Sequence, residues 1–292
     1  MKLDNWDIKQ AVKDWVTDRK YALEEYGHIS EWDTSEVTIM NNLFYNDGDN
    51  ILFGDFNEDI SNWDVSKVTH MSSMFRDATN FNIDISGWDV SNVVDMRFMF
   101  CNATSFNQNI NNWDVSNVAD MSRLFAGAKN FNKPLNKWDT SNCLDMEAMF
   151  RDAIKFDQPI GSWNTRNVKK INGIFKNAYN FNQNINDWRL FNVTDFRFFF
   201  QNAINFNQPL DNWIFPQVTR YYKMFAGADA FNQDISTWSM KFAYSIEHMF
   251  DGAMSFSQDL SAWNLGKHTK TKHAFKNAHS MKQGFLPKQC YF

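Results

Sequence analysis

The chain has 292 residues, of which 17% are aromatic, and this content of rings is too high for a disordered protein. No apolar run approaches the roughly 18 residues that a membrane-spanning helix requires, so the sequence predicts no membrane span. The three cysteines, Cys101, Cys143 and Cys290, are odd in number and far apart. This argues against a disulfide framework and a Cys-rich metal site, and it fits a reducing compartment.

The N-terminal segment, residues 4–27, places Ile8, Val12, Trp15 and Val16 on one face of a helix, with charges elsewhere. We therefore expect residues 1–31 to form a helical N-terminal cap that covers the first repeat. The segment lacks the uninterrupted apolar core of a secretory signal. An intracellular or virion-associated location is therefore favoured over secretion.

A tryptophan then recurs every twenty-five residues. It marks the start of successive repeats at Trp63, Trp88, Trp113, Trp138, Trp163, Trp188, Trp213, Trp238 and Trp263. A first copy begins at Trp32, so residues 32–280 hold ten repeats, followed by a C-terminal tail, residues 281–292. A fixed period of this length predicts one continuous repeat array. We number positions within a repeat from its Trp, which is position 0.

The first repeat carries a six-residue insertion near residues 46–55. Four aspartates, at positions 47, 49, 55 and 59 of the chain, suggest calcium at first sight. Their spacing lacks the calcium-loop pattern with its closing Glu, so no metal is predicted.

Apolar residues recur at positions 5, 8, 11, 12 and 15, a spacing typical of a helical stripe. Position 14 is always Asp, Asn or Gly, the residue types that end helices in a left-handed conformation. Early repeats have Ser at position 3, which is suited to cap a first turn. A short helix from about position 4 to 13 is predicted.

Phe at position 18 and Ile or Leu at position 22 lie on one face of a predicted strand. The predicted fold is therefore an α/β repeat solenoid, leucine-rich-repeat-like, with a short parallel strand and a short helix in each of about ten coils. Equivalent rings should stack from coil to coil. This structural ladder comprises the nine tryptophans given above and, at position 12, Phe75, Phe100, Phe125, Phe150 and Phe175.

From Trp163 onward the Trp-Asp-Val-Ser motif is no longer kept, and aromatic residues replace polar ones. One interpretation is a locally repacked core, and the other is an aromatic docking surface flanked by cations. Together with variable positions on the predicted helix, the candidate binding residues are Arg97, Phe98, Arg123, Phe191, Arg197, Phe198, Phe215, Arg220, Tyr222 and Lys223.

The net charge of −5 is unevenly distributed, because residues 265–292 hold six Lys and no Asp or Glu. This basic end is either a solvated terminus or a site for nucleic acid or another polyanion. Its candidate binding residues are Lys267, Lys270 and Lys272.

No phosphate-binding loop, paired-histidine metal motif or nucleophile elbow occurs in the sequence. Aspartates recur in nearly every repeat, which favours turn formation over catalysis. We therefore expect no enzyme activity, no cofactor and no metal. The leading interpretation is a protein-binding or structural scaffold, and end-to-end self-association stays open. An alternative is carbohydrate binding along the Asn row at position 19, which comprises Asn82, Asn107, Asn132, Asn182, Asn207 and Asn232.

The segments WDVSNVADMSRLFAGAKNFN and YGHISEWDTSEVTIM resemble the repeat of the BspA-like leucine-rich-repeat surface protein family, the variant also seen in mycoplasma lipoproteins. The resemblance covers about residues 26–280, and the segment around His28 is similar to copies in protists, algae and their large DNA viruses. It implies a leucine-rich-repeat-like solenoid with roles in adhesion and protein binding. The chain shows neither a signal peptide nor a lipid-attachment cysteine near its start. This favours an intracellular or virion-associated binding scaffold over a cell-surface adhesin.

Overall fold

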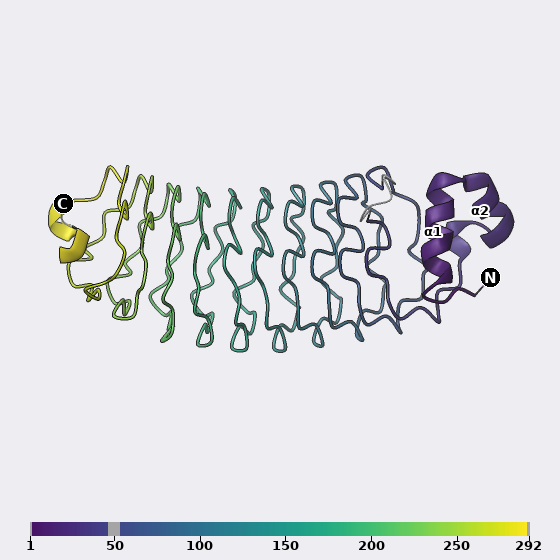
Figure 1. Cartoon of the computed structure of the whole chain (residues 1–292), viewed down its shortest axis with the longest axis horizontal. Coiled ribbons are helices and arrows are strands. Elements are labelled where there is room, and N and C mark those ends of the chain that lie inside the picture. Colours follow the sequence, from purple (N-terminus) through teal and green to yellow (C-terminus); the bar gives the residue numbers. More distant parts are fainter. Residues whose placement is uncertain (1, 46–52, 291–292) are drawn as a thin grey trace.

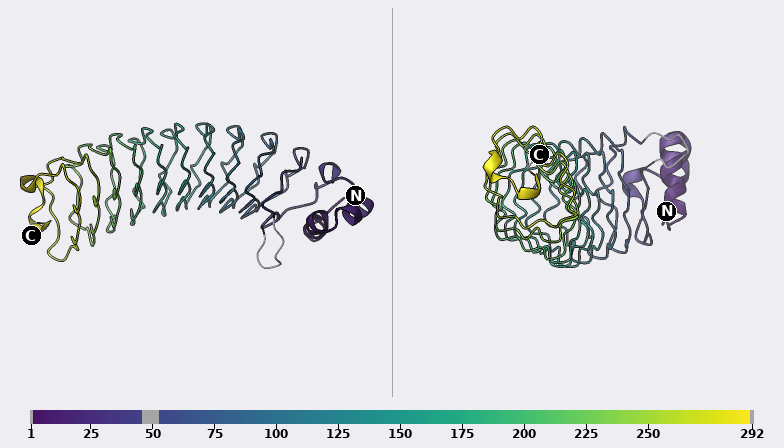
Figure 2. Two further views of the ribbon diagram at one scale, coloured as in Figure 1. Left: turned by 90° about the horizontal axis from the view of Figure 1, so that it is seen from above. Right: turned by 60° about the vertical axis from the view of Figure 1, so that its left-hand side comes forward.

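The computed structural model describes residues 2–45 and 53–290, arranged as a long stack of coils with a helical cap at one end (Figure 1). The helices are α1 (Asp7–Thr17), α2 (Arg19–Tyr26) and the short 3-10 helices η1 (Ile29–Glu31), η2 (Gln283–Phe285) and η3 (Lys288–Cys290). The stack bends gently along its length (Figure 2). We call the coils 1 to 10, from Trp32 to Trp263.

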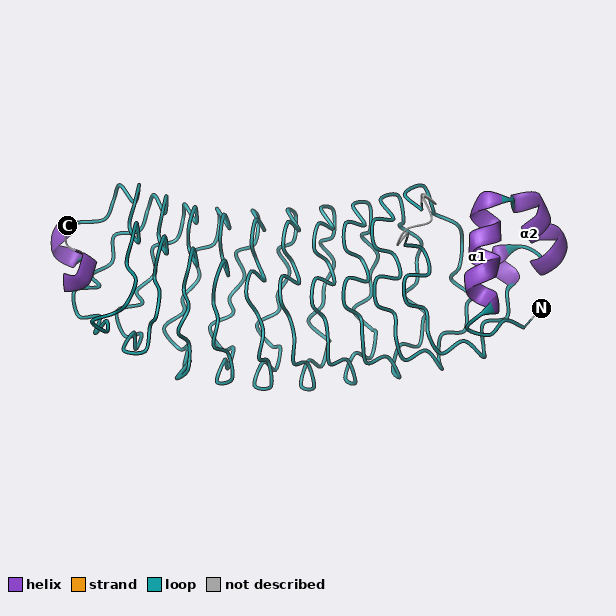
Figure 3. Ribbon diagram, in the orientation of Figure 1, coloured by secondary structure: helices purple, strands orange, loops and turns teal. Residues whose placement is uncertain are grey.

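The prediction of an α/β solenoid with a helix and a strand in each coil is wrong. All described helices lie at the two ends of the chain, and the coils between them are turns and loops (Figure 3). Among the described residues, β-pairing is limited to isolated parallel bridges, which in the stack join position 7 of successive coils, for example Asp95 with Asp120.

The predicted helix does not form because the backbone amides around positions 8 to 12 alternate between acceptors in the next coil and acceptors in their own coil. In coil 4, Met121 and Arg123 at positions 8 and 10 donate to carbonyls of coil 5, at 2.9 and 2.8 Å. The intervening amide of Leu124 donates within its own coil, to the carbonyl of Met121 at 3.2 Å. An α-helix would need every amide to bond four residues back in the same segment. Half of these amides instead join the coils together.

Positive φ angles make this alternation possible. Position 10 has a positive φ in every coil, for example 54° at Arg123, and position 14 repeats it, with 71° at Gly127. With the bonds from Leu124 to Met121 and from Ala128 to Phe125, these are type II turns, which require a positive φ at their third residue. The Asp, Asn and Gly of position 14 therefore mark a turn and not the end of a helix.

The predicted strand fails for a related reason. The amide of Asn107 at position 19 donates to the side-chain Oδ1 of Asn82 in the preceding coil at 2.9 Å, and Asn132 donates to Asn107 in the same way at 3.0 Å. A side chain thus replaces the backbone carbonyl that a parallel ladder would use. Pro134 and its equivalents at position 21 have no amide hydrogen to donate.

The core is a set of aromatic columns that run along the stack. Position 12 rings of neighbouring coils lie 5.7 Å apart between Phe100 and Phe125, with planes 6° apart. Within a coil, the ring of Phe100 stacks on that of Phe106 at 3.9 Å. The Trp rings at position 0 also stack, as between Trp138 and Trp163 at 6.2 Å. All of these rings are buried.

Each indole also ties neighbouring coils together through a hydrogen bond. Nε1 of Trp113 donates to the carbonyl of Ile85 at 3.1 Å, and Nε1 of Trp138 donates to that of Ile110 at 3.0 Å. The carbonyl of Ile110 also accepts the amide of Trp113 at 3.1 Å. A carbonyl has two lone pairs, so one oxygen closes its own turn and fixes the next coil.

The cap closes the first coil. Asp4 accepts the amides of Trp6 and Asp7 at the start of α1, at 2.7 and 2.9 Å. Trp15 on the buried face of α1 meets Trp32 edge to face at 5.8 Å. Most of the predicted insertion, residues 46–52, lies outside the described residues. Among those described, no helix is long and apolar enough to cross a membrane.

Candidate functional site

Positions 9 and 10 form an outward surface that follows the stack. They are the two central residues of the type II turn that begins at position 8, while positions 8 and 11 point into the core. Seven of the predicted binding residues lie at these two positions, and each is fully or partly exposed: Arg97, Phe98, Arg123, Arg197, Phe198, Tyr222 and Lys223.

In coils 7 to 10 this surface carries a continuous row of rings, which we call the external ring row: Phe198, Tyr222, His248 and His273. The rings of Phe198 and Tyr222 meet edge to face at 5.4 Å. Tyr222 and His248 follow at 5.8 Å, and His248 and His273 at 5.0 Å. All four are partly exposed. The coil spacing therefore prearranges four rings on the outside.

Cations flank the external ring row. The Nζ of Lys176 lies 5.0 Å from the ring centroid of Phe198, and the Nζ of Lys223 lies 5.4 Å from that of Tyr222. Partial burial lowers the pKa of Lys176. Arg197 is held by an ion pair with Asp195 at 2.7 Å, and this hydrogen bond raises the pKa of the guanidinium. The surface thus combines rings with fixed positive charge.

Earlier coils use the same two positions differently. The Phe98 ring lies between two guanidinium groups, with Arg76 at 5.2 Å and Arg123 at 5.1 Å. Arg123 is in turn paired with Glu147 at 2.8 Å. Here one ring contacts two guanidinium groups, whereas Phe198 and Tyr222 each contact one lysine amine and also each other.

Phe215 does not belong to an outer surface. It is only 7% exposed, and it meets Phe196 at 5.3 Å and Trp238 at 5.0 Å, both edge to face. Position 2 points inward in every coil, so Phe215 enlarges the core. Phe191 at position 3 is partly exposed on a different edge from the external ring row, and Arg220 at position 7 lies 3.8 Å from Asp195.

A second exposed apolar group combines Phe242, one of the late aromatic residues that the sequence assigns to a possible docking surface, with Ile214, which sequence reasoning did not select. Ile214 is 56% exposed and Phe242 is 62% exposed. They line a pocket of about 340 Å³ whose walls include Trp213 and Pro216. The available signal was the change of residue type: Ile214 stands where coils 1–5 have Asp, and Phe242 stands where coils 3–7 have Asn.

The basic end of the chain is exposed. Lys267, Lys270 and Lys272 are all solvent accessible in coil 10. Lys270 lies 4.9 Å from the ring of Tyr244, and its hydrogen bond to Tyr244 raises the pKa of its amine.

The Asn row at position 19, predicted as a candidate carbohydrate site, and the aspartates of position 7 take part in hydrogen bonds within the chain. The Oδ1 atoms of the position 19 row accept amides of the next coil, and Nε2 of Gln158 donates to Oδ1 of Asn132 at 2.9 Å. Position 7 carboxylates bond the amide two residues on, as Asp120 does with Ser122 at 2.8 Å. Across residues 2–45 and 53–290, no group of three or more His, Cys, Asp or Glu is placed to hold a metal.

Comparison with known families adds one result. Three overlapping segments, residues 11–122, 106–213 and 185–288, match the family described as Mycoplasma protein of unknown function, DUF285. No curated protein matches the sequence. Together the matched segments run from α1 to η3 and include every coil. The chain therefore belongs to the DUF285 family of repeat proteins.

Proposed function

We propose that the chain is a non-catalytic protein-binding scaffold, and that its docking surface is the external ring row with its flanking cations. The observation that carries this proposal is the contact series from Phe198 through Tyr222 and His248 to His273, with ring centroids 5.4, 5.8 and 5.0 Å apart. Rows of partly exposed rings next to Lys and Arg resemble the groups that dominate binding energy at protein interfaces.

The row suits a peptide segment in an extended conformation. Its four rings span about 16 Å along the stack, which is the length of roughly five extended residues. Because each ring already contacts its neighbour, little side-chain conformational entropy is lost when a partner binds. Lys176 and Lys223 favour a partner with carboxylates beside its apolar residues.

The family description names no activity, so support for a binding role comes from this surface and from the resemblance to BspA-like repeats, whose roles centre on adhesion and protein binding. Carbohydrate binding along the position 19 row has less support. The Oδ1 atoms of that row accept backbone amides, for example that of Asn207 on Asn182 at 2.9 Å, so they are not free for sugar hydroxyls.

The test compares what two variants capture from an extract of the native source, with quantitative mass spectrometry as the measurement. F198S/Y222S removes the centre of the external ring row. Y179S, which changes a 37% exposed ring on another edge, is the matched control. We expect F198S/Y222S to lose partners that the wild type and Y179S both retain, while its circular dichroism spectrum is unchanged. An identical set of captured proteins for all three would contradict the proposal.

A further inference from the structure

The edge formed by positions 1–6 of each coil carries opposite charge in the two halves of the stack. In coils 1–5, position 1 is an aspartate every time: Asp33, Asp64, Asp89, Asp114 and Asp139. In coils 6–10, the same six positions contain no Asp or Glu. They hold five cations instead: Arg166, Lys169, Arg189, Lys241 and Lys267. We call these two halves of one edge the acidic half-edge and the basic half-edge.

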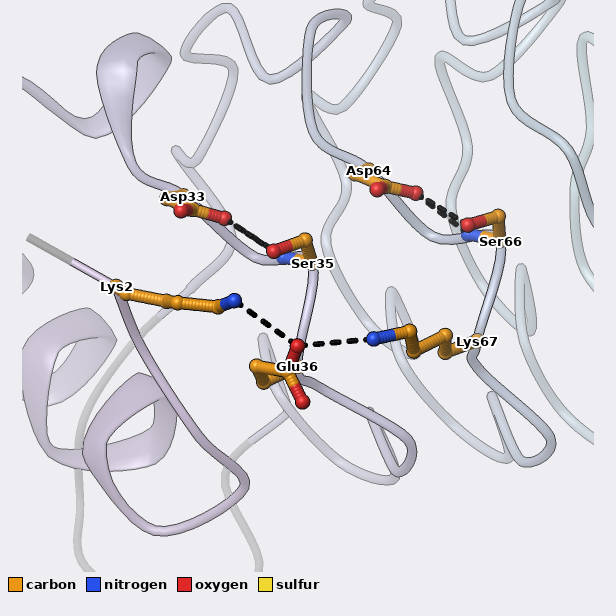
Figure 4. Close-up of polar contacts among 7 residues, drawn as sticks. All are labelled: Lys2, Asp33, Ser35, Glu36, Asp64, Ser66 and Lys67. Atoms are coloured by element: carbon orange, nitrogen blue, oxygen red, sulfur yellow. Dashed lines mark hydrogen bonds and ion pairs between the residues drawn. The ribbon is translucent and has the colours of Figure 1, made fainter.

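Neither set of charges is neutralised within the chain. The remaining charges on the acidic half-edge, Glu36 and Lys67, pair with each other at 2.9 Å, and Glu36 also pairs with Lys2 at 2.9 Å (Figure 4). Among the described residues, the ion pairs of this chain include none of the five aspartates and none of the five cations. One guanidinium nitrogen of Arg189 is even buried without a hydrogen-bond acceptor.

The aspartates are held in a fixed direction. Asp33 accepts the amide and hydroxyl of Ser35 at 3.1 and 2.6 Å, and Asp64 accepts those of Ser66 at 3.0 and 2.6 Å, so that both carboxylates repeat in the same place (Figure 4). These bonds lower the pKa of both carboxyls, which are therefore ionised at neutral pH. The acidic half-edge is thus a regular row of like charges, one per coil.

Such a row repels itself. Neighbouring coils are close, with the stacked rings of Trp32 and Trp63 at 6.0 Å, and the Debye length at physiological salt is about 8 Å. Adjacent aspartates therefore repel each other with little screening by salt. Most cations of the basic half-edge lie too far along the stack to offset this repulsion within one chain. Cations placed along the row would relieve the repulsion, and the basic half-edge has one or two of them in every coil except coil 8.

The same edge exposes apolar side chains in both halves. Val94 and Leu144 on the acidic half-edge are 38% and 40% exposed. On the basic half-edge, Ile214, Phe242 and Tyr244 are 56%, 62% and 54% exposed. Complementary charge gives orientation, and apolar area gives affinity.

We infer that the partner of this edge is a second copy of the chain, bound antiparallel about a twofold axis between coils 5 and 6. Coil 5 then faces coil 6 of the other copy, so Asp139 meets Arg166 and Lys169. Coil 4 faces coil 7, which places Asp114 opposite Arg189. Only the antiparallel direction sets every acidic coil against the basic half-edge, since a parallel pair would oppose like charges. The contact is isologous and closes at two copies.

The outer coils follow the same rule. Coil 2 faces coil 9 and coil 1 faces coil 10, so Asp64 lies opposite Lys241 and Asp33 opposite Lys267. Coil 3 faces coil 8, which has no cation at these positions. There Asp89 lies opposite Ile214, which occupies the same position, so this is the one pairing in which an aspartate faces no cation. This edge is separate from the external ring row at positions 9 and 10, and the inference does not depend on the proposed function.

The first experiment is sedimentation velocity of the full chain, at low and at high salt, with two charge-reversed variants. R166E/K169E/K241E/K267E reverses four of the five cations of the basic half-edge, and D64R/D89R/D114R/D139R reverses four of the five aspartates of the acidic half-edge. We expect the wild type to be a dimer at low salt that dissociates at high salt. Each variant alone should be a monomer, and an equal mixture of the two should restore a dimer. F198S/Y222S, which leaves this edge intact, should remain dimeric.

A wild type that is monomeric at low salt would overturn the inference, even if the basic half-edge bound some other acidic partner. A dimer that persists in either variant would also overturn it. Because the wild-type salt series stands alone, the test holds even where a variant fails to fold by circular dichroism.

A cross-linking experiment fixes the direction of the pair. Asn92 and Gln217 both occupy position 4, in coils 3 and 8. N92C and Q217C should form disulfides with each other when mixed, and neither should cross-link with itself. Self-linking of N92C would indicate a parallel pair and contradict the antiparallel arrangement.

Discussion

Coils 2 to 5 and coils 8 to 10 keep the same register with different turn chemistry. In the early coils, Nδ2 of Asn117 at position 4 donates to the carbonyl of Ser91 at 2.8 Å, and Asn142 repeats this bond with Ser116. The series ends at Asn192, because the later coils have Gln217, Phe242 and Lys267 at this position.

The turn itself also lengthens in coil 8, although not in coil 9, where the amide of Ala243 lies 3.0 Å from the carbonyl of Met240. The amide of Val118 lies 2.9 Å from the carbonyl of Val115, whereas Val218 lies 3.5 Å from that of Phe215. The ring columns nevertheless continue, with Phe200 and Phe225 at 5.4 Å. The comparison indicates that the rings and the indole bonds maintain the register. Positions 1–6 are thereby free to vary, and the late coils use them to present apolar and basic side chains.

The largest predicted effect removes a ring from each region. Phe125→Ala in coil 4 and Phe225→Ala in coil 8 should each lower the free energy of unfolding by about 3–5 kcal/mol, because both leave a cavity in the same column. Urea denaturation followed by tryptophan fluorescence measures both. If rings maintain the register throughout, the two losses should be similar. A much smaller loss in coil 8 would mean that the late coils rely on other contacts.

A second prediction concerns the turn at position 14. Gly127 has a φ of 71°, and a Cβ there would overlap Oδ1 of Asn102 in the preceding coil. Gly127→Ala should therefore cost about 1–3 kcal/mol of stability. The matched late substitution, Gly227→Ala, meets Asn202 in the same way and should cost as much.

The double variant N102G/G127A, compared with N102G alone, isolates the overlap, because glycine tolerates the positive φ of 58° at residue 102. Gly127→Ala should cost less in the N102G background, and the cost that remains reports the backbone strain at residue 127. Independent, additive effects of the two substitutions would show that the side chains do not interfere.

A third prediction removes the indole hydrogen bond. Trp113→Phe deletes the donor to Ile85, at 3.1 Å, while the amide of Trp88 still bonds that carbonyl. The expected loss is about 1–2 kcal/mol, because a hydrogen bond and some packing disappear but the carbonyl stays satisfied. Trp213→Phe, which removes the equivalent bond to Ile185, should behave alike. Thermal unfolding of both variants provides the comparison.

A fourth prediction tests the polar ladder directly. Asn117→Ala should lower stability by about 1 kcal/mol, since its amide bonds the preceding coil. Gln217→Ala, at the same position in coil 8, should leave stability unchanged. Equal losses of stability for the two substitutions would show that the side chain at position 4 contributes as much to the late turns as to the early ones.

The smallest predicted effect is a pH dependence. Hydrogen bonds from Ser66 lower the pKa of Asp64 below its ordinary value, so the carboxylate contributes stability above the unfolded pKa of about 4. This contribution is lost as the pH falls through the lower, folded pKa. Asp64→Asn should flatten the acid limb of the stability curve below about pH 4. Asn164→Asp, at the same position in coil 6, should steepen it.

The period of the sequence assigns every residue to a position, and from it the inward and outward sides of most positions can be predicted. The local backbone could not be predicted in the same way. A spacing of three residues suits both a helix and a run of turns that each close with an i to i+3 bond. The deciding feature is a positive φ at position 10, where the chain places Phe98, Phe198 and Lys223, residue types that seldom adopt it.

For the candidate site, exposure of positions 9 and 10 follows from the buried positions on either side, so Phe198 and Tyr222 could be selected from the sequence. Phe215 could have been rejected, because position 2 is an apolar residue or Thr in every other coil, which indicates an inward position. Charge segregation along positions 1–6 was present in the sequence too. It acquires meaning only once the structure places those positions on one edge.

The repeated contact between coils has a consequence for the length of the molecule. The stacked rings and the indole hydrogen bonds join each coil to the next at the same positions in the early and in the late coils. These contacts do not fix the number of coils, so the length of the stack depends on how many copies of the twenty-five-residue unit the gene encodes. Loss or gain of a twenty-five-residue unit would shorten or extend the rod by one step and leave every other contact in place. The length of such a protein can therefore be adjusted in steps of one coil, which suits a scaffold that must span a defined distance.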